Sequence, residues 1–315
     1  MKKIINTIFV VLTFAALVLT GCGSAPQSAD EGLKVIASTS FLADIAQNVA
    51  GDRLTVESLL PIGADPHAYQ AAPADVSKIA ESDVLILNGI EYEHFIEPLL
   101  ENAGGERLVI EATTGLTPHE VEEHEESEEH TEEDEEHGHE AGDPHMWLDP
   151  NLVITYVENI RDGLSEADPD GAESYQSNAE AYIAQLQDLD AFIREQVESI
   201  PAERRLLVTN HEALGYFAER YGFEIVDTIL PSFSSEAGAS AQEIASAVDA
   251  VKDSGAPAIF LGEVENADLA NQIAAETGIV VVDNLYFESL THGEPAATYL
   301  DMMKHNVTQI VNALK

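Results

Sequence analysis

The chain of 315 residues carries 58 Asp and Glu against only 14 Lys and Arg, which gives a formal net charge of −44. Because binding to nucleic-acid phosphates needs clustered Lys and Arg, this balance excludes nucleic acid as a partner. Hydrophobic residues make up 45% of the chain, enough to build one large core or two of ordinary size.

The N-terminus has the features of a bacterial export signal. Two lysines precede the apolar run 4–19, and the Leu-Thr-Gly-Cys sequence that ends at Cys22 resembles a lipobox. We expect a signal peptide over 1–21, a lipid on Cys22 and a linker over 22–33. These would tether the chain outside the cytoplasmic membrane. A plain transmembrane anchor is the alternative, but the run is short for a span.

Short apolar runs alternate with amphipathic segments in the first block of the chain. We predict strands at 35–39, 54–60, 84–87 and 108–110, and helices at 40–50, 74–82, 95–102 and 150–164. Strands that alternate with helices predict a parallel sheet with helices on both faces. We expect an N-terminal α/β domain over 34–166.

An acidic, histidine-rich segment over 117–142 interrupts this domain and contains no Lys or Arg. Such a segment cannot bury enough apolar surface to fold, so we expect a disordered loop. Its histidines are candidates for weak zinc sites that raise the local ion concentration. The alternative is a solvated loop without a role. The histidines are His119, His124, His130, His137 and His139.

A long helix is expected over 167–200, because apolar residues recur every three or four positions. They are Tyr175, Ala179, Tyr182, Leu186, Leu189, Ile193 and Val197. This helix would rigidly connect to a second α/β domain over 201–315. There we predict strands at 206–209, 225–229, 258–261 and 279–282, and helices at 212–221, 241–253, 267–277 and 299–314.

Histidines follow predicted strands in both domains. These are His67, His145 (beyond the acidic loop) and His211, and carboxylates follow the last strand in the segment 283–289. In parallel sheets, ligands bind beyond the carboxyl ends of the strands. Cys22 is the only cysteine, so a metal site in the mature domains must use His, Asp or Glu. We therefore expect a metal ion in a cleft between the two domains.

Three motifs resemble the substrate-binding lipoproteins of bacterial zinc and manganese ABC transporters. They are Asp-Pro-His at 65–67, Asp-Pro-His-Met-Trp-Leu-Asp-Pro at 143–150 and His-Glu-Ala-Leu-Gly-Tyr-Phe at 211–217. The resemblance covers nearly all the chain from Lys34 onward. It implies two α/β domains joined by a long helix, with the metal between them.

The same resemblance implies metal ligands at His67, His145 and His211. The family carries an acidic residue, in many members Asp, within a short motif that Phe-Glu-Ser matches here, so Glu288 is the expected fourth ligand. Asp283 is the runner-up. The other histidines of the two domains, His94, His292 and His305, are expected to be ordinary solvated or hydrogen-bonded residues.

Three imidazoles and one carboxylate favour Zn²⁺, since Mn²⁺ prefers more oxygen ligands. We expect a monomeric receptor, not an enzyme, that hands Zn²⁺ to an ABC permease and its ATPase. A Mn²⁺ or Fe²⁺ receptor of the same fold is the first alternative. A zinc hydrolase with Glu288 as base is the second, but the His-Glu-x-x-His motif is missing. A surface adhesin is the third, and no receptor-binding motif supports it.

Overall fold

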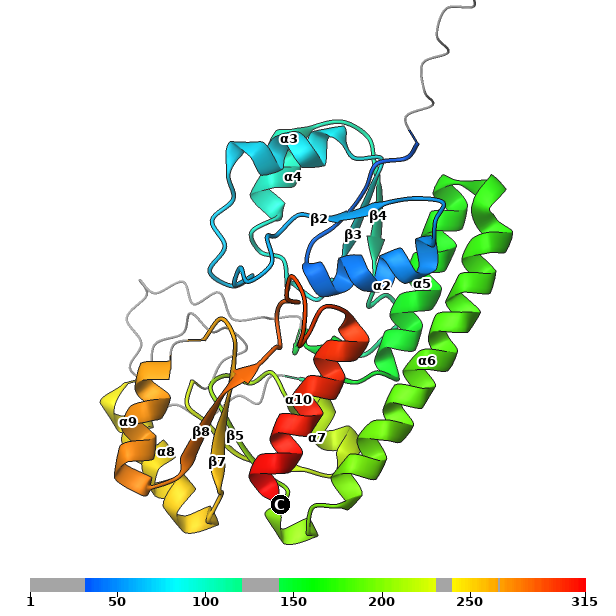
Figure 1. Cartoon of the computed structure of the whole chain (residues 1–315). Helices are drawn as coiled ribbons and strands as arrows, with labels where there is room; N and C mark the ends of the chain where they lie inside the picture. The colour runs from blue at the N-terminus through cyan, green and yellow to red at the C-terminus, as the bar shows by residue number, and fades with distance from the viewer. Residues whose placement is uncertain (1–31, 121–141, 231–239, 266) are drawn as a thin grey trace, which may run out of the picture. The chain divides into compact units, whose positions relative to one another are not determined.

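The computed structural model describes residues 32–120, 142–230, 240–265 and 267–315, and Leu33–Lys315 forms one compact unit (Figure 1). The expected signal peptide and the lipidation site at Cys22 lie outside these residues. Among the helices of the described ranges, none combines the length and the apolar character that crossing a membrane requires.

The first sheet has four parallel strands in the order β2-β1-β3-β4. The strands are β1 (Val35–Ala37), β2 (Val56–Ser58), β3 (Val84–Leu87) and β4 (Leu108–Glu111). Val35 pairs with Val56 on one side and with Val84 on the other. The order reverses between β1 and β3, so the loops after these two strands diverge at a topological switch point.

Helices cover both faces of this sheet, as the alternation predicted. They are α2 (Ser40–Ala50), α3 (Pro73–Glu81), α4 (Glu97–Ala103) and α5 (Leu152–Ala167). Successive strand residues point to opposite faces. Val84 and Ile86 therefore join the core formed with α2 and α5. Leu85 and Leu87 pack on the other face with residues of α3 and α4.

The second sheet repeats the pattern with the parallel order β6-β5-β7-β8. Its strands are β5 (Leu206–Thr209), β6 (Glu224–Thr228), β7 (Ala258–Gly262) and β8 (Val280–Leu285), and its helices are α7 (Gly215–Tyr221), α8 (Ala241–Ser254), α9 (Ala267–Thr277) and α10 (Tyr299–Leu314). Phe260 packs with α7 and α10. Ile259 and Leu261 pack on the opposite face with α8 and α9.

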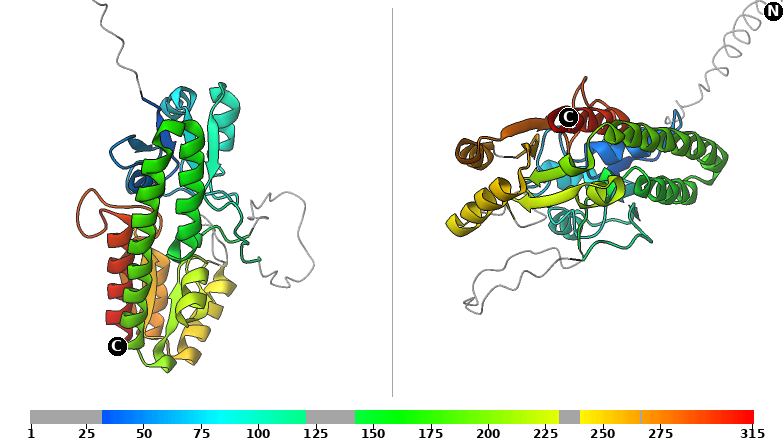
Figure 2. Two further views of the ribbon diagram at one scale, coloured as in Figure 1. Left: turned by 90° about the vertical axis from the view of Figure 1, so that its right-hand side faces the viewer. Right: turned by 90° about the horizontal axis from the view of Figure 1, so that it is seen from below.

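The long helix α6 (Ala172–Glu198) follows a short 3-10 turn, Pro169–Gly171, and spans 27 residues. All seven residues of its predicted apolar stripe are buried. It contacts α2, α5 and α10, and Figure 2 shows α5 and α6 side by side. One apolar cluster therefore runs from β1 and β3 through α6 to β7. The domain boundaries at 166 and 201 stay a prediction.

Several predicted boundaries are wrong by a few residues, and three of them belong to the elements that border the site. The strand at 54–60 is limited to Val56–Ser58. The helix predicted at 212–221 begins at Gly215, because the chain first turns with a hydrogen bond from the Ala213 N–H to the His211 carbonyl. The last strand extends to Leu285, because a register shift in β7 lets Gly262 pair with Leu285.

Candidate metal centre

The structure brings together the four residues that the sequence singled out. His67, His145, His211 and Glu288 each offer one ligand atom, and these atoms all lie within 4.8 Å of one another. His145, His211 and Glu288 are buried, with exposed fractions of 0%, 1% and 2%. Such a buried group of three imidazoles and a carboxylate has the chemistry of a site for a divalent cation.

The spacing of the ligand atoms fits four-coordinate geometry. Glu288 Oε1 lies 3.4 Å from His145 Nε2, 3.5 Å from His211 Nε2 and 3.8 Å from His67 Nε2. The Nε2 atoms of His145 and His211 are 3.4 Å apart. Tetrahedral zinc with bonds of about 2.0–2.1 Å holds its ligand atoms about 3.4 Å apart. The group is therefore close to the size that a zinc ion requires.

The centre lies at the carboxyl ends of both sheets. His211 comes directly after β5 and Glu288 shortly after β8, whereas His67 lies in the loop that follows β2. His145 immediately precedes the 3-10 turn Met146–Leu148. Ligand sites of open parallel sheets lie at this edge, where strand order reverses. Here the reversal falls between β1 and β3 and between β5 and β7.

Each Asp-Pro-His motif forms a tight turn around its histidine. Asp143 Oδ1 accepts hydrogen bonds from the backbone N–H of His145 at 2.9 Å and from its Nδ1–H at 2.8 Å. This contact fixes the tautomer and leaves Nε2 facing Glu288. Asp65 Oδ1 accepts the backbone N–H of His67 in the same way, at 2.9 Å. Asp143 therefore orients the His145 ring.

A carboxylate from the turn after β7, in the same sheet as β5, orients His211. Glu265 Oε1 accepts a hydrogen bond from His211 Nδ1–H, and Glu265 Oε2 accepts the backbone N–H of Gly262 at 2.5 Å. Burial alone would lower the pKa of His211, but its hydrogen bond with Glu265 and its close contact with the Glu288 carboxylate outweigh burial and raise the pKa to about 10. In the metal-free protein this imidazole therefore holds a proton.

Two backbone N–H groups beside Glu288 are held by one side chain. Glu263 Oε2 accepts the Phe287 N–H at 2.8 Å, and Glu263 Oε1 accepts the Ser289 N–H at 2.7 Å. Glu263 follows β7 directly, and Glu265 lies two residues further along the same turn. The end of β7 therefore positions two of the four candidate ligands.

Residues of the first block hold the same short segment from the other side. The indole N–H of Trp147 donates to the Phe287 carbonyl at 2.8 Å. The Gly63 N–H donates to Ser289 Oγ at 2.7 Å, and Leu290 N–H donates to Ser40 Oγ at 2.9 Å. Glu288 is therefore fixed by contacts from both halves of the chain.

The electrostatics of the centre favour a cation. Burial alone would raise the pKa of Glu288, but its contacts with the three imidazoles, His145 first, hold that pKa well below the ordinary value. Burial likewise opposes the charged form of His145, yet Asp143 and Glu288 raise its pKa. Glu288 therefore remains an anion, which protons on the imidazoles balance until a metal ion replaces them.

Other predicted site residues lie elsewhere. Asp283 is an exposed residue of β8 and does not belong to the four-residue group. His119 Nε2 lies 2.8 Å from Glu219 Oε2, and its ring stacks on Tyr216 at 4.0 Å. The remaining histidines of the acidic segment lie outside the described residues: His124, His130, His137 and His139.

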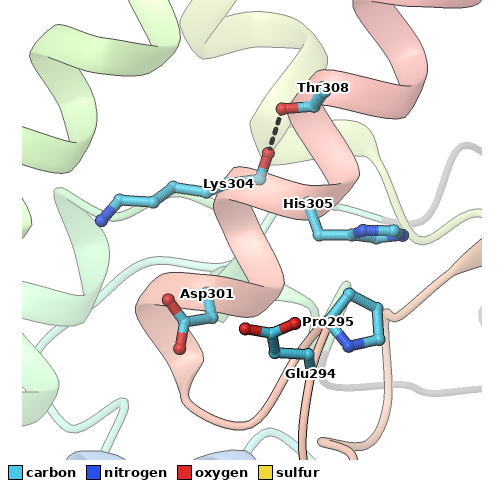
Figure 3. A pocket seen from close by; sticks show the side chains of 6 residues that line it. All are labelled: Glu294, Pro295, Asp301, Lys304, His305 and Thr308. Carbon is cyan, nitrogen blue, oxygen red and sulfur yellow. Dashed lines mark hydrogen bonds between the residues drawn. The ribbon is translucent and has the colours of Figure 1, made fainter.

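A separate pocket of about 380 Å³ is lined by Glu294, Pro295, Asp301, Lys304, His305 and Thr308 (Figure 3). Here the ring Nε2 of His305 lies 2.8 Å from the Asn284 carbonyl, to which it donates a hydrogen bond. No member of the four-residue group lines this pocket. His305 is thus a hydrogen-bonded residue, as expected.

Sequence reasoning missed several of the side chains that hold the candidate ligands. Tyr92 follows β3 and donates its hydroxyl to Glu288 Oε2 at 2.5 Å, and Glu263 and Glu265 follow β7. The hydroxyl of Tyr216 donates to the Asp143 carbonyl at 2.7 Å. The signal was available in principle, because β3 and β7 border the points where strand order reverses.

Comparisons with known proteins agree with this architecture. A family model described as "Zinc-uptake complex component A periplasmic" matches residues 35–313. The chain is 37% identical to the manganese-binding lipoprotein MntA of Halalkalibacterium halodurans, over 100% of this chain and 99% of the relative. It is 32% identical to the manganese ABC transporter substrate-binding lipoprotein PsaA of Streptococcus mitis, over 100% and 99%.

A solved structure with the same fold is the periplasmic zinc-binding protein TroA from Treponema pallidum. Its TM-score with this chain is 0.77 at 28% sequence identity, and the match covers 90% of this chain and 99% of that one. The names of these relatives thus include both zinc and manganese.

Proposed function

We propose a function from one premise: the chain belongs to the family described as periplasmic zinc-uptake complex component A. It is accordingly a substrate-binding component of a metal ABC importer and not an enzyme. The hydrolase alternative, in which Glu288 acts as a free general base, is therefore wrong. Membership in this family does not identify the metal that the chain binds or the residues that bind it.

Our proposal is that the chain captures Zn²⁺ with His67, His145, His211 and Glu288. The observation that carries it is the spacing of the four ligand atoms, with Glu288 Oε1 3.4–3.5 Å from two imidazole nitrogens. Four nitrogen and oxygen ligands at this spacing suit tetrahedral zinc. One carboxylate leaves a net positive charge on the occupied centre, and burial favours neutral imidazole over further anions.

The competing proposal is a Mn²⁺ or Fe²⁺ receptor of the same fold, and manganese in the names of two relatives supports it. Manganese favours a larger set of oxygen ligands. Within the described residues the four-residue group supplies one carboxylate. We therefore favour zinc, and Asp283, exposed on β8, is no longer proposed as the fourth ligand.

The proposed setting is outside the cytoplasmic membrane, with the chain tethered by lipid on Cys22 and delivering its ion as a monomer to a permease and ATPase. The lipoprotein names of two relatives support the tether. The histidines of the acidic segment 117–142 would supply weak auxiliary metal sites. A role in cell adhesion has no supporting observation here.

Elemental analysis tests this function on the full-length chain purified without added metal. We expect about one equivalent of zinc per chain, and zinc should outcompete manganese in equilibrium dialysis. Each of His67→Ala, His145→Ala and His211→Ala should lower zinc affinity by at least about tenfold to a hundredfold, because even lost outer partners cost that much. His305→Ala is the matched control and should bind as the wild type does. Bound manganese, or tight zinc in any one of the three variants, would contradict the proposal.

A further inference from the structure

Tyr92 forms a hydrogen bond with one of the two carboxylate oxygens of Glu288, the candidate carboxylate ligand. Its hydroxyl donates to Glu288 Oε2 at 2.5 Å, while Glu288 Oε1 faces the three imidazole nitrogens. Oε1 is buried and makes no hydrogen bond with the described residues. The two oxygens of the Glu288 carboxylate thus differ in role. Oε1 faces the position of the ion, and Oε2 accepts the hydrogen bond of the Tyr92 hydroxyl.

The backbone around Tyr92 is unusual and fixed. Gly89, Ile90 and Glu91 have φ values of 95°, 55° and 53°, so three successive residues adopt the left-handed region. This conformation is costly for a β-branched residue such as Ile90. Backbone strain of this kind persists only where surrounding contacts impose it, and it gathers at functional positions. The turn therefore points to a specific requirement for the position of Tyr92.

Glu93 supplies the contacts that impose the turn. It is buried, and its carboxylate accepts hydrogen bonds from Ser38 Oγ at 2.7 Å, from the Asn88 N–H at 2.6 Å and from the Gly89 N–H at 3.1 Å. The Tyr92 ring, 1% exposed, packs with its centroid 4.8 Å from Trp147 and 5.5 Å from His67. The hydroxyl is consequently preorganised toward Glu288.

We propose that Tyr92 is a specificity-determining residue that keeps Glu288 monodentate and so favours four-coordinate Zn²⁺ over Mn²⁺. This inference rests on the proposed function of the four-residue group. To bind through both oxygens, Glu288 would have to turn Oε2 away from Tyr92. That movement breaks a short hydrogen bond to a charged group and leaves the phenol buried without its acceptor. A metal that needs both carboxylate oxygens binds only if the Tyr92–Glu288 hydrogen bond is broken. Four-coordinate zinc needs one oxygen, so it binds with that hydrogen bond intact.

Cobalt loaded into the full-length chain reports coordination number directly, because four-coordinate Co²⁺ absorbs visible light far more strongly than five- or six-coordinate Co²⁺. The wild type should show the strong spectrum. Tyr92→Phe keeps the ring and removes the hydroxyl, so its spectrum should weaken. The ratio of Mn²⁺ to Zn²⁺ affinity should rise by about tenfold, the lower range for loss of an outer partner.

The matched control is Tyr299→Phe. Tyr299 is equally buried and donates its hydroxyl to a backbone carbonyl, that of Trp147, at 2.7 Å. Its spectrum and metal preference should equal those of the wild type. If Tyr92→Phe leaves both readouts unchanged, or if Tyr299→Phe alters them equally, the inference is overturned.

A measurement on the wild type avoids any dependence on how the variant folds. The splitting between the two carboxylate stretching bands differs between monodentate and bidentate binding, and infrared difference spectra with Zn²⁺ can reveal it. We expect the monodentate signature, and a bidentate signature would overturn the role of Tyr92. Tight zinc binding that survives His67→Ala would instead overturn the proposed function, so the two failures are distinguishable.

Discussion

A carboxylate on Nδ1 turns a histidine into a ligand with a single available nitrogen. His145 has this partner in Asp143 and His211 has it in Glu265. In each case Nε2 is left to face the centre, with the two Nε2 atoms 3.4 Å apart. Partners of this kind orient metal-binding histidines and increase their basicity. In the metal-free protein the same contacts raise the affinity of the rings for protons.

Zinc binding should therefore release protons. The pKa of His211 is raised to about 10, so this ring is protonated in the metal-free chain between pH 6 and 9. Zinc binds only the neutral ring, so apparent affinity should rise with pH, by about tenfold per unit for each displaced proton. Conversely, the stability that this proton gives the metal-free fold is complete below about pH 6.5 and is lost as pH rises through about 10.

Calorimetry in buffers of different ionisation enthalpy counts the protons released. We expect about one or more per zinc ion at pH 7 in the wild type and at least one fewer in His211→Ala. Zero protons released by the wild type would contradict the assignment of His211 as a protonated ligand.

Prediction from sequence succeeded at the residue scale where a local motif carries the geometry. Asp143 and His145 are two positions apart, and the turn between them needs no other element. Tyr92 and Glu265 could not be identified in this way. Their roles depend on Glu288 and His211, which are distant in the sequence and meet them only after both sheets have formed.

At the scale of elements, the loop after β7 positions the second half of the centre. Glu263 holds the two backbone N–H groups that flank Glu288, and Glu265 holds His211. The rigid end of a buried strand thereby sets the spacing between two candidate ligands that belong to different loops. Sites supported by regular elements in this way keep their geometry better than sites on free loops.

Glu263→Gln should loosen this support. The amide NH₂ of Gln cannot accept a hydrogen bond, so it would face the N–H of Phe287 or Ser289 without an acceptor. We expect the free energy of unfolding to fall by about 1–3 kcal/mol, the usual cost of an unsatisfied buried polar group. The affinity for zinc should also fall, because Glu288 would be held less firmly.

Chemical denaturation and zinc titration measure both effects. The exposed Glu276→Gln on α9 is the control and should match the wild type in stability and affinity. If Glu263→Gln behaved like that control, Glu263 would have no positioning role.

The elements themselves were largely predictable because hydrophobic periodicity determines them. All seven residues of the α6 stripe are buried as expected. The errors lie where tertiary contacts decide. The β8 strand continues to Leu285 because β7 shifts its register, and no periodicity in the sequence marks that shift.

At the scale of the molecule, both halves of the chain hold the same ligand segment. Trp147, Gly63 and Ser40 bind it from the first block, while Glu263 binds it from the second. The apolar core is also continuous through α6. Release of the ion should therefore proceed by small displacements of loops such as 287–290, and not by wide separation of the two sheets.

The central claim is that His67, His145, His211 and Glu288 share one zinc ion. X-ray absorption at the zinc edge, recorded on the full-length chain with one equivalent of Zn²⁺, tests it most directly. The account predicts three imidazole nitrogens and one carboxylate oxygen at about 2.0–2.1 Å. A first shell with fewer than three imidazoles, or with six oxygen-dominated ligands, would contradict it.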